Sequence, residues 1–299
     1  MKLVDDPEQM SNLSAAFRQK IRENCTFTVL KQVTMQESAL DGTRKYLFEL
    51  EDHNMVESVL MRYKHGNSVC ISSQVGCRMG CRFCASTLDG LVRNLTPAEM
   101  LEQIYRISAD TGERVSNVVV MGTGEPLDNY DNLLTFIRML TDENGLHISQ
   151  RNLTVSTCGL VPRIRDLAKE GLQITLALSL HASNQEKRLE LMPVAKSYDI
   201  HEAVDAMQDY FEETGRRVTF EYSLVAGVND TEEDARELAE LIHGINCHVN
   251  LIPVNPIKER DFVQPDGKSV QEFKNKLEKC RINAVSYTHL RAHETSLHL

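Results

Sequence analysis

The sequence predicts an α/β fold in which a parallel sheet is covered by helices and is preceded by a small antiparallel β extension. Two observations support this. After residue 70, short apolar runs alternate with segments of helical length, which is the pattern of buried parallel strands joined by helices. Before residue 66, three β-like runs are separated by short turn signals, as in an antiparallel meander.

The N-terminal region, residues 1–66, is predicted to hold one helix and this meander. Residues 11–22 carry apolar side chains at helical spacing, including Phe17 and Ile21, so this face should pack against the core. The strands are expected at residues 27–33, 44–50 and 55–63, with turn residues between them.

The second region, residues 67–285, is predicted to alternate strands and helices. Its first helix has a clear start, because Thr96 and Glu99 form a capping box with Pro97 at the first helical position. Strands are expected at residues 115–121, 153–156, 174–180, 218–224, 248–253 and 282–285, and further helices at 129–140, 161–169, 201–214, 231–242 and 270–279. Six such units are too few for a closed eight-stranded barrel.

Composition places the chain among ordinary globular proteins, because 41% of its 299 residues are hydrophobic and 25% are charged. No apolar run reaches the length of a membrane span and the first residues do not resemble a signal peptide, so we expect a cytoplasmic protein with no membrane partner. Eight cysteines in such a chain favour metal or redox use over a disulfide framework.

The formal net charge of −10 counts against a protein that binds nucleic acid through its net charge alone. A local basic patch is still possible. Its candidate members are the basic residues at predicted loops and strand ends, namely Arg78, Arg82, Arg93, Arg151, Arg216, Arg217, Lys258 and Arg260.

Three cysteines stand close together, with Cys77, Cys81 and Cys84 in a C-x3-C-x2-C run. Three thiolates on one loop can bind a soft metal centre and leave one coordination position open. A structural zinc site is the first alternative, but it needs a second pair of ligands, and the cysteines farther along the chain are isolated. Inert buried cysteines are the other alternative. An iron–sulfur site is therefore the leading hypothesis.

Polar residues follow several of the predicted strands, at the end where parallel sheets gather their functional groups. The strand at 115–121 leads into a turn that contains Gly124 and Glu125, which could let the backbone approach a ligand while the carboxylate accepts a hydrogen bond from an amine. A tight strand-to-helix turn explains the glycines equally well. Other polar residues at strand ends are more often loop caps than ligands when they are considered singly.

The cysteine run resembles the signature of the radical S-adenosylmethionine (SAM) superfamily. Residues 74–87, QVGCRMGCRFCAST, are similar to one branch, the RlmN/Cfr family of RNA adenine methyltransferases, and closest to its RlmN members. Residues 150–157, 178–182 and 250–255 match the same branch, so the resemblance covers roughly residues 10 to 285.

The resemblance implies a partial (β/α)6 barrel that binds a [4Fe–4S] cluster and SAM. Cys77, Cys81 and Cys84 would hold the cluster. The SAM pocket would be lined by Gly124, Glu125, Ser156, Ser179, Leu180, His181 and Asn255.

The resemblance also implies methylation of C2 of adenosine in 23S rRNA and tRNA through a methyl-cysteine intermediate. Glu57 would be the base that takes the C2 proton, and Cys70 would form a transient disulfide that releases the product. Without the family, Glu57 reads as a solvent-facing strand carboxylate and Cys70 as a buried strand cysteine. An electron donor such as flavodoxin or ferredoxin is implied, and we expect a monomer. The alternatives are methylation at C8, as by Cfr, and a non-catalytic iron–sulfur or zinc binding protein.

The chain departs from the family pattern at both ends. The small helical domain that precedes the meander in the family is expected to be largely missing, and residues 286–299 are expected to be a non-native tail. The tail cysteine that carries the methyl group in the family has no counterpart here, and Cys280 lies in a predicted helix instead. We therefore expect cluster assembly and SAM cleavage without methyl transfer.

Overall fold

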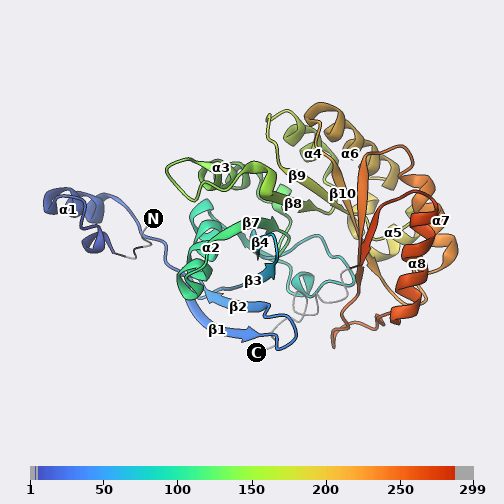
Figure 1. Cartoon of the computed structure of the whole chain (residues 1–299), viewed down its shortest axis with the longest axis horizontal. Helices are drawn as coiled ribbons and strands as arrows, with labels where there is room; N and C mark the ends of the chain where they lie inside the picture. Colours follow the sequence, from blue (N-terminus) through green and yellow to red (C-terminus); the bar gives the residue numbers. More distant parts are fainter. Residues whose placement is uncertain (1–3, 5, 287–299) are drawn as a thin grey trace.

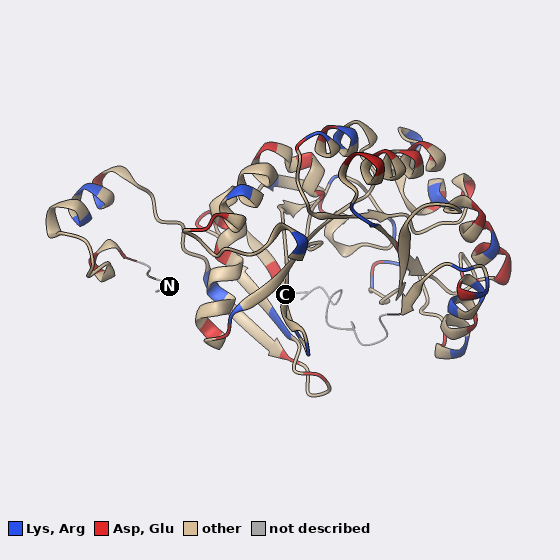
Figure 2. Ribbon diagram, turned by 45° about the horizontal axis from the view of Figure 1, so that its top comes forward, with Lys and Arg blue, Asp and Glu red and all other residues tan. Residues whose placement is uncertain are grey.

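One open sheet organises the protein, in the strand order β1-β2-β3-β4-β7-β8-β9-β10-β11-β12 (Figure 1). This computed structural model describes residue 4 and residues 6–286. Most charged side chains lie on the helices, while the strands carry few (Figure 2). The predicted α/β fold, with a parallel sheet that follows antiparallel strands, is confirmed.

The first strands form the predicted antiparallel meander. They are β1 (Lys31–Glu37), β2 (Arg44–Glu49), β3 (Met55–Tyr63) and β4 (Gly66–Ile71). Strand β1 begins later than the predicted residue 27 because its first rung joins Lys31 to Glu49, the last residue of β2. The residues before Lys31 therefore have no partner strand.

From β4 onward every pairing in this sheet is parallel, and helices connect the strands in turn. The strands are β7 (Val115–Val120), β8 (Leu153–Thr157), β9 (Thr175–Ser179), β10 (Val218–Leu224), β11 (Cys247–Pro253) and β12 (Ala284–Ser286). The helices are α2 (Pro97–Thr111), α3 (Tyr130–Thr141), α4 (Val161–Ala168), α5 (Gln185–Leu191), α6 (Ile200–Thr214), α7 (Glu232–Leu241) and α8 (Gly267–Lys279). Strands β1 and β12 are the two edges, so the barrel stays open.

Two short elements were not predicted. Helix α5 has seven residues, and most of them are polar, so its sequence lacks the apolar period that marks a helix. Strands β5 (Gln74–Gly76) and β6 (Leu91–Asn94) form a separate two-stranded sheet that brackets the cysteine run. Both elements matter for the site, because they hold the loop that carries the three cysteines.

Helix α1 (Ala15–Asn24) forms as predicted, but its apolar face does not pack against the core. None of its residues is buried, and the Phe17 side chain is 51% exposed. Figure 1 shows α1 standing apart from the sheet at the end of an extended segment. The predicted burial of this face is therefore wrong for the residues that the structure describes.

Two further expectations concern the C-terminal tail and membrane-spanning helices. Of the expected non-native tail, residues 286–299, all but Ser286 lie outside the described residues. Within the described part, no helix combines the length and the apolar character that crossing a membrane requires.

The start of α2 gives a test of the capping box. Thr96 accepts a hydrogen bond from the Glu99 N–H, and the Glu99 carboxylate accepts one from the Thr96 N–H. We expect Thr96→Ala to lower the free energy of unfolding by about 1 kcal/mol, measured by urea denaturation. Ser14→Ala removes the matching cap of α1 and is the control. It should leave the global unfolding free energy unchanged, because α1 buries no residue, and equal losses would contradict this view of α1.

Candidate active site

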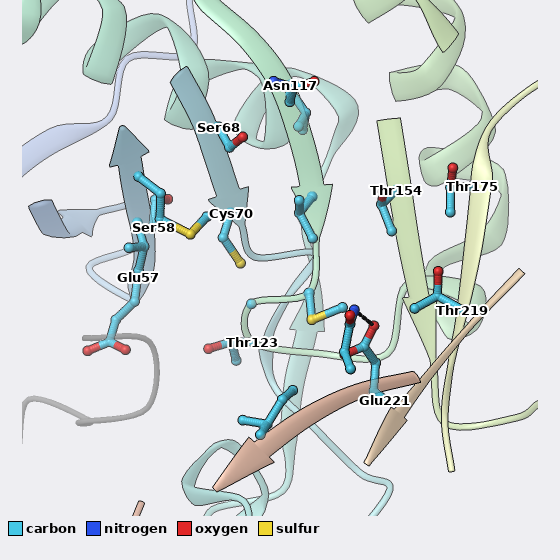
Figure 3. Close-up of a pocket in the computed structure, with 18 of the residues that line it drawn as sticks. Glu57, Ser58, Ser68, Cys70, Asn117, Thr123, Thr154, Thr175, Thr219 and Glu221 are labelled. Carbon is cyan, nitrogen blue, oxygen red and sulfur yellow. Dashed lines mark hydrogen bonds between the residues drawn. The ribbon is translucent and has the colours of Figure 1, made fainter. Parts of the chain in front are cut away.

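Two neighbouring cavities lie along the parallel strands, the smaller one near their carboxyl ends and the larger one reaching back to their amino ends. The smaller cavity has a volume of about 160 Å³, and the three clustered cysteines line it. The larger one has a volume of about 710 Å³ and extends to Glu57 and Cys70 on the meander (Figure 3). Both cavities are bordered by a shared set of residues, Phe83, Cys84, Ser86, Met121, Gly122, Glu221 and Ile252.

Backbone hydrogen bonds fix the shape of the cysteine loop. The Cys77 N–H donates to the Gly90 carbonyl at 2.9 Å, which ties the start of the loop to the β6 side. The Thr87 hydroxyl donates to the carbonyls of Cys81 and Cys84, at 3.0 and 2.9 Å. These bonds hold the three thiols around one small cavity before anything binds there.

Burial keeps the Cys77 and Cys81 thiols protonated. It raises the pKa of Cys77 to about 11 and raises the pKa of Cys81 still further, and the neighbouring sulfurs add to both shifts. A group that binds the sulfurs as thiolates must therefore release their protons.

The loop fits a cluster better than a single ion. Among the described residues, no group of three His, Cys, Asp or Glu side chains is close enough to hold one metal ion. In a [4Fe–4S] cluster each thiolate binds a different iron, so its sulfurs stand farther apart than the ligands of a single ion. Three cysteines around one cavity, with a fourth side open toward Glu125 and Ser156, have the arrangement that such a cluster needs.

The glycine turn after β7 places Glu125 at this open side. Its buried carboxylate accepts hydrogen bonds from the backbone N–H groups of Leu127 and Cys158, at 3.0 and 2.7 Å, and burial raises its pKa. The side chains of Thr157 and Cys158 also act on it as hydrogen-bond donors, which opposes the effect of burial. Gly124 lines the same cavity, and a Cβ on it would lie 2.6 Å from the Gln74 side chain, so the turn can pack this closely only with glycine.

The other expected SAM-pocket residues divide into three groups. Ser156, Ser179 and His181 line the smaller cavity, and the two serine hydroxyls lie 3.3 Å apart. Leu180 lines neither cavity, since its side chain is fully buried in the core. Asn255 lines only the larger cavity.

His181 is neutral and has a defined tautomer. Its Nδ1 accepts a hydrogen bond from the Ser223 N–H at 2.9 Å, so its proton is on Nε2. Burial, and then the positive charge of Arg188, lower its pKa to about 3. The ring also packs edge-on against Phe83.

On the meander side, Glu57 is paired with a lysine that sequence reasoning missed. The Lys45 ammonium lies 2.8 Å from the Glu57 carboxylate, and the Lys45 side chain is only 2% exposed, against 25% for Glu57. Lys45 stands opposite Val59 in the β2–β3 ladder, so it is a diagonal neighbour of Glu57 on the same face. The sequence signal that could have identified Lys45 is its place inside the predicted strand 44–50, two positions before Leu47 and therefore on the same face.

Cys70 lies in β4 and lines the larger cavity, next to Val59 and Met61 (Figure 3). Burial raises its pKa to about 12, so it is a thiol at neutral pH. Glu221, also missed, lies at the junction of the two cavities. It accepts a hydrogen bond from the Asn250 side chain, and burial raises its pKa to about 7.

The candidate basic patch is divided in the structure. Arg93 pairs with Asp52 and Glu99, and Arg78 pairs with Asp128, so their charges are compensated. The larger cavity is instead bordered by three of the other arginines, Arg151, Arg216 and Arg217.

Comparison with known proteins agrees with this geometry. A model of the radical SAM superfamily matches residues 71–242. The chain is 64% identical to a probable dual-specificity RNA methyltransferase RlmN of Lachnospira eligens, over 95% of this chain and 81% of that protein. It is 61% identical to the protein of the same name in Lachnoclostridium phytofermentans, over 95% and 80%. The crystal structure of a radical SAM methyltransferase from Sphaerobacter thermophilus superposes with a TM-score of 0.90 at 42% identity, over 95% of this chain and 84% of that one.

The Lys45–Glu57 pair predicts an asymmetric response to mutation. We expect Glu57→Gln to lower the free energy of unfolding by about 3 kcal/mol, because it leaves the buried ammonium without its carboxylate. Lys45→Met should lower the free energy of unfolding by a smaller amount, because the Glu57 carboxylate that it leaves unpaired with Lys45 can reach solvent. Urea denaturation of both variants measures this difference, and a larger loss in Lys45→Met would contradict the assigned burial.

The neutral state of His181 predicts a pH dependence of stability. The unfolded imidazole takes up a proton below its ordinary pKa of 6.5, whereas the folded one does so only near pH 3. The stability that the neutral ring contributes is therefore complete above pH 6.5 and is lost as the pH falls toward 3. The test variant is His181→Asn, because Asn tolerates the positive φ at this position. When the pH is lowered from 7 to 5, we expect the free energy of unfolding of this variant to fall by roughly 2 kcal/mol less than that of the parent protein. Urea unfolding at both pH values tests this, and parallel losses would contradict it.

Proposed function

This chain belongs to the RlmN family of the radical SAM superfamily, and we propose that it is built to methylate C2 of adenosine in 23S rRNA and tRNA. One observation supports this proposal most strongly. The three loop cysteines and the strand-end residues Glu125, Ser156, Ser179 and His181 surround the same small cavity. A cluster site with polar groups for SAM beside it is what this chemistry needs.

The chain's own residues would divide the work at this cavity. We assign the cluster to Cys77, Cys81 and Cys84, which leave one coordination position for SAM. When bound, the cluster and SAM supply one-electron chemistry, which C2 of adenine requires because its C–H is not acidic. Glu125 would accept a hydrogen bond from the SAM amino group, since it lines the cavity beside the three cysteines. His181 would donate its Nε2–H into the pocket.

The larger cavity would receive the adenine. Glu57 is our candidate for the base that removes the C2 proton, and the Lys45 ammonium lies 2.8 Å from its carboxylate. We assign Cys70 the resolving role. Because burial keeps it a thiol, it must lose its proton to a base before it can attack a sulfur. The arginines at the border of this cavity supply positive charge for the RNA backbone.

We also propose the remaining partners. The cluster needs a one-electron donor, of the flavodoxin or ferredoxin class, and we expect the chain to act as a monomer in the cytoplasm. Nothing in the assignment of the site requires a second copy, because one chain supplies each residue named above.

The first test uses anaerobically reconstituted protein. We expect about four irons per chain with matching sulfide, and 5′-deoxyadenosine after reduction with dithionite in the presence of SAM. The matched control is the triple variant Cys77→Ala, Cys81→Ala, Cys84→Ala, which should bind no iron and produce no 5′-deoxyadenosine. Zinc uptake without SAM cleavage would contradict the proposal and favour a metal-stabilised binding protein.

Nucleoside mass spectrometry tests the position of methylation. No cysteine follows Cys280 in this sequence, so we expect this 299-residue chain to cleave SAM without methylating RNA. Formation of 2-methyladenosine from 23S rRNA or tRNA would overturn that expectation but support the C2 assignment. Formation of 8-methyladenosine would overturn the C2 assignment in favour of Cfr-type activity.

A further inference from the structure

Arg188 is a buried cation directly behind the cysteine loop. It lies on α5, and only 1% of its surface is exposed. Its guanidinium lines neither cavity, so it is not placed to contact a substrate. Among the described residues it forms no ion pair with a carboxylate. A positive charge without water or a counterion is costly in a protein interior, and it calls for a physical explanation.

Backbone carbonyls provide only part of that explanation. Nη1 donates to the carbonyls of Ser179 and Leu180, at 3.0 and 2.5 Å, and Nη2 donates to the carbonyl of Cys158 at 2.7 Å. The guanidinium thus joins the ends of β8 and β9. Its Nε has no hydrogen-bond partner among the described residues. Dipoles stabilise the cation here, but they do not neutralise it.

The sulfurs of the site are what this charge acts on. The guanidinium donates to the Cys158 carbonyl and lies 3.7 Å from the Met192 sulfur, and Cys158 and Met192 pack in one buried cluster with Cys81. The wall between the guanidinium and the loop is apolar, since Cys81 packs with Leu191 and Met192. Water cannot screen the interaction across such a wall, so it is stronger than between exposed groups.

We propose that Arg188 is the buried countercharge of the iron–sulfur cluster, and that it stabilises the reduced cluster over the oxidised one. This inference rests on the proposed function. A cluster held by three thiolates is anionic, and one-electron reduction by an external donor makes it more negative by one unit. No bond forms or breaks in that step, and Arg188 keeps its proton. A fixed cation nearby therefore raises the reduction potential. Arg188 acts through the cluster and the strand ends, so it is a positioning residue.

The test separates charge from hydrogen bonding. Arg188→Gln and Arg188→Lys both lose the guanidinium contacts, but only the lysine keeps the charge. Redox titration of the reconstituted proteins, followed by electron paramagnetic resonance, should give about a tenfold lower ratio of reduced to oxidised cluster for Arg188→Gln at a fixed potential. For a one-electron couple, tenfold corresponds to about 59 mV. Arg188→Lys should stay within about threefold of the parent protein.

Arg82→Gln is the matched control. Arg82 is next to Cys81 in the sequence, but its side chain is 53% exposed, so solvent screens its charge and the potential should not move. Circular dichroism melting of each apo variant checks folding independently of the cluster. If Arg188→Gln takes up no iron while a folded Arg188→Lys does, the charge requirement is supported.

Three results would overturn the inference. The first is an unchanged potential in Arg188→Gln, and the second is an equal fall in both Arg188 variants, which would leave Arg188 only a structural role. The third is folded variants that both fail to take up iron, since the guanidinium contacts would then matter and not the charge. In each case the parent protein still cleaves SAM, and the proposed function stands. If the parent protein itself binds no cluster, both proposals fail.

Discussion

Exclusion of water from the strand ends is the constraint on which this site depends. It makes charge costly there, so the cavity is lined by neutral thiols, a neutral His181 and a carboxylate, Glu125, with a raised pKa. The cation that remains, Arg188, lies behind the loop and not in the cavity. A group that binds there enters a region of low dielectric, where its charge strongly affects the protonation states of the neighbouring side chains.

The fold creates this environment through strand ends rather than through the loop alone. Crossover helices bring the carboxyl ends of β7, β8 and β9 to one edge, and each end contributes a polar group. The close approach of Gly124 to Gln74 joins the turn after β7 to the segment before the cysteines. Arg188 joins the ends of β8 and β9 from behind. The cysteine loop therefore lies against a frame that packing and backbone hydrogen bonds have already fixed.

Sequence reasoning predicted the elements that carry a strong period and the residues that carry a motif. The capped helix α2 and the buried strand β10 are examples, because caps and apolar periods are local properties. Lys45 and Arg188 were missed because their importance is not local. Lys45 matters through a diagonal contact across two strands, and Arg188 through carbonyls at the ends of two different strands. The prediction that the apolar face of α1 is buried was wrong for a different reason. An apolar period predicts that a helix face is buried, but it does not identify the surface against which that face packs.

The acidic character of the chain also has a positional explanation. A net charge of −10 opposes RNA at long range, yet many of the charges lie on the outer helices, away from the inner face of the sheet (Figure 2). Two of the expected basic residues, Arg78 and Arg93, are paired with carboxylates and would contribute little to phosphate binding. The arginines at the border of the larger cavity remain available for phosphate contacts. Because they are few, they would release few counterions from the RNA and contribute little to affinity. If the larger cavity receives the adenine as proposed, substrate choice depends more on the fit of that base than on attraction to the RNA backbone.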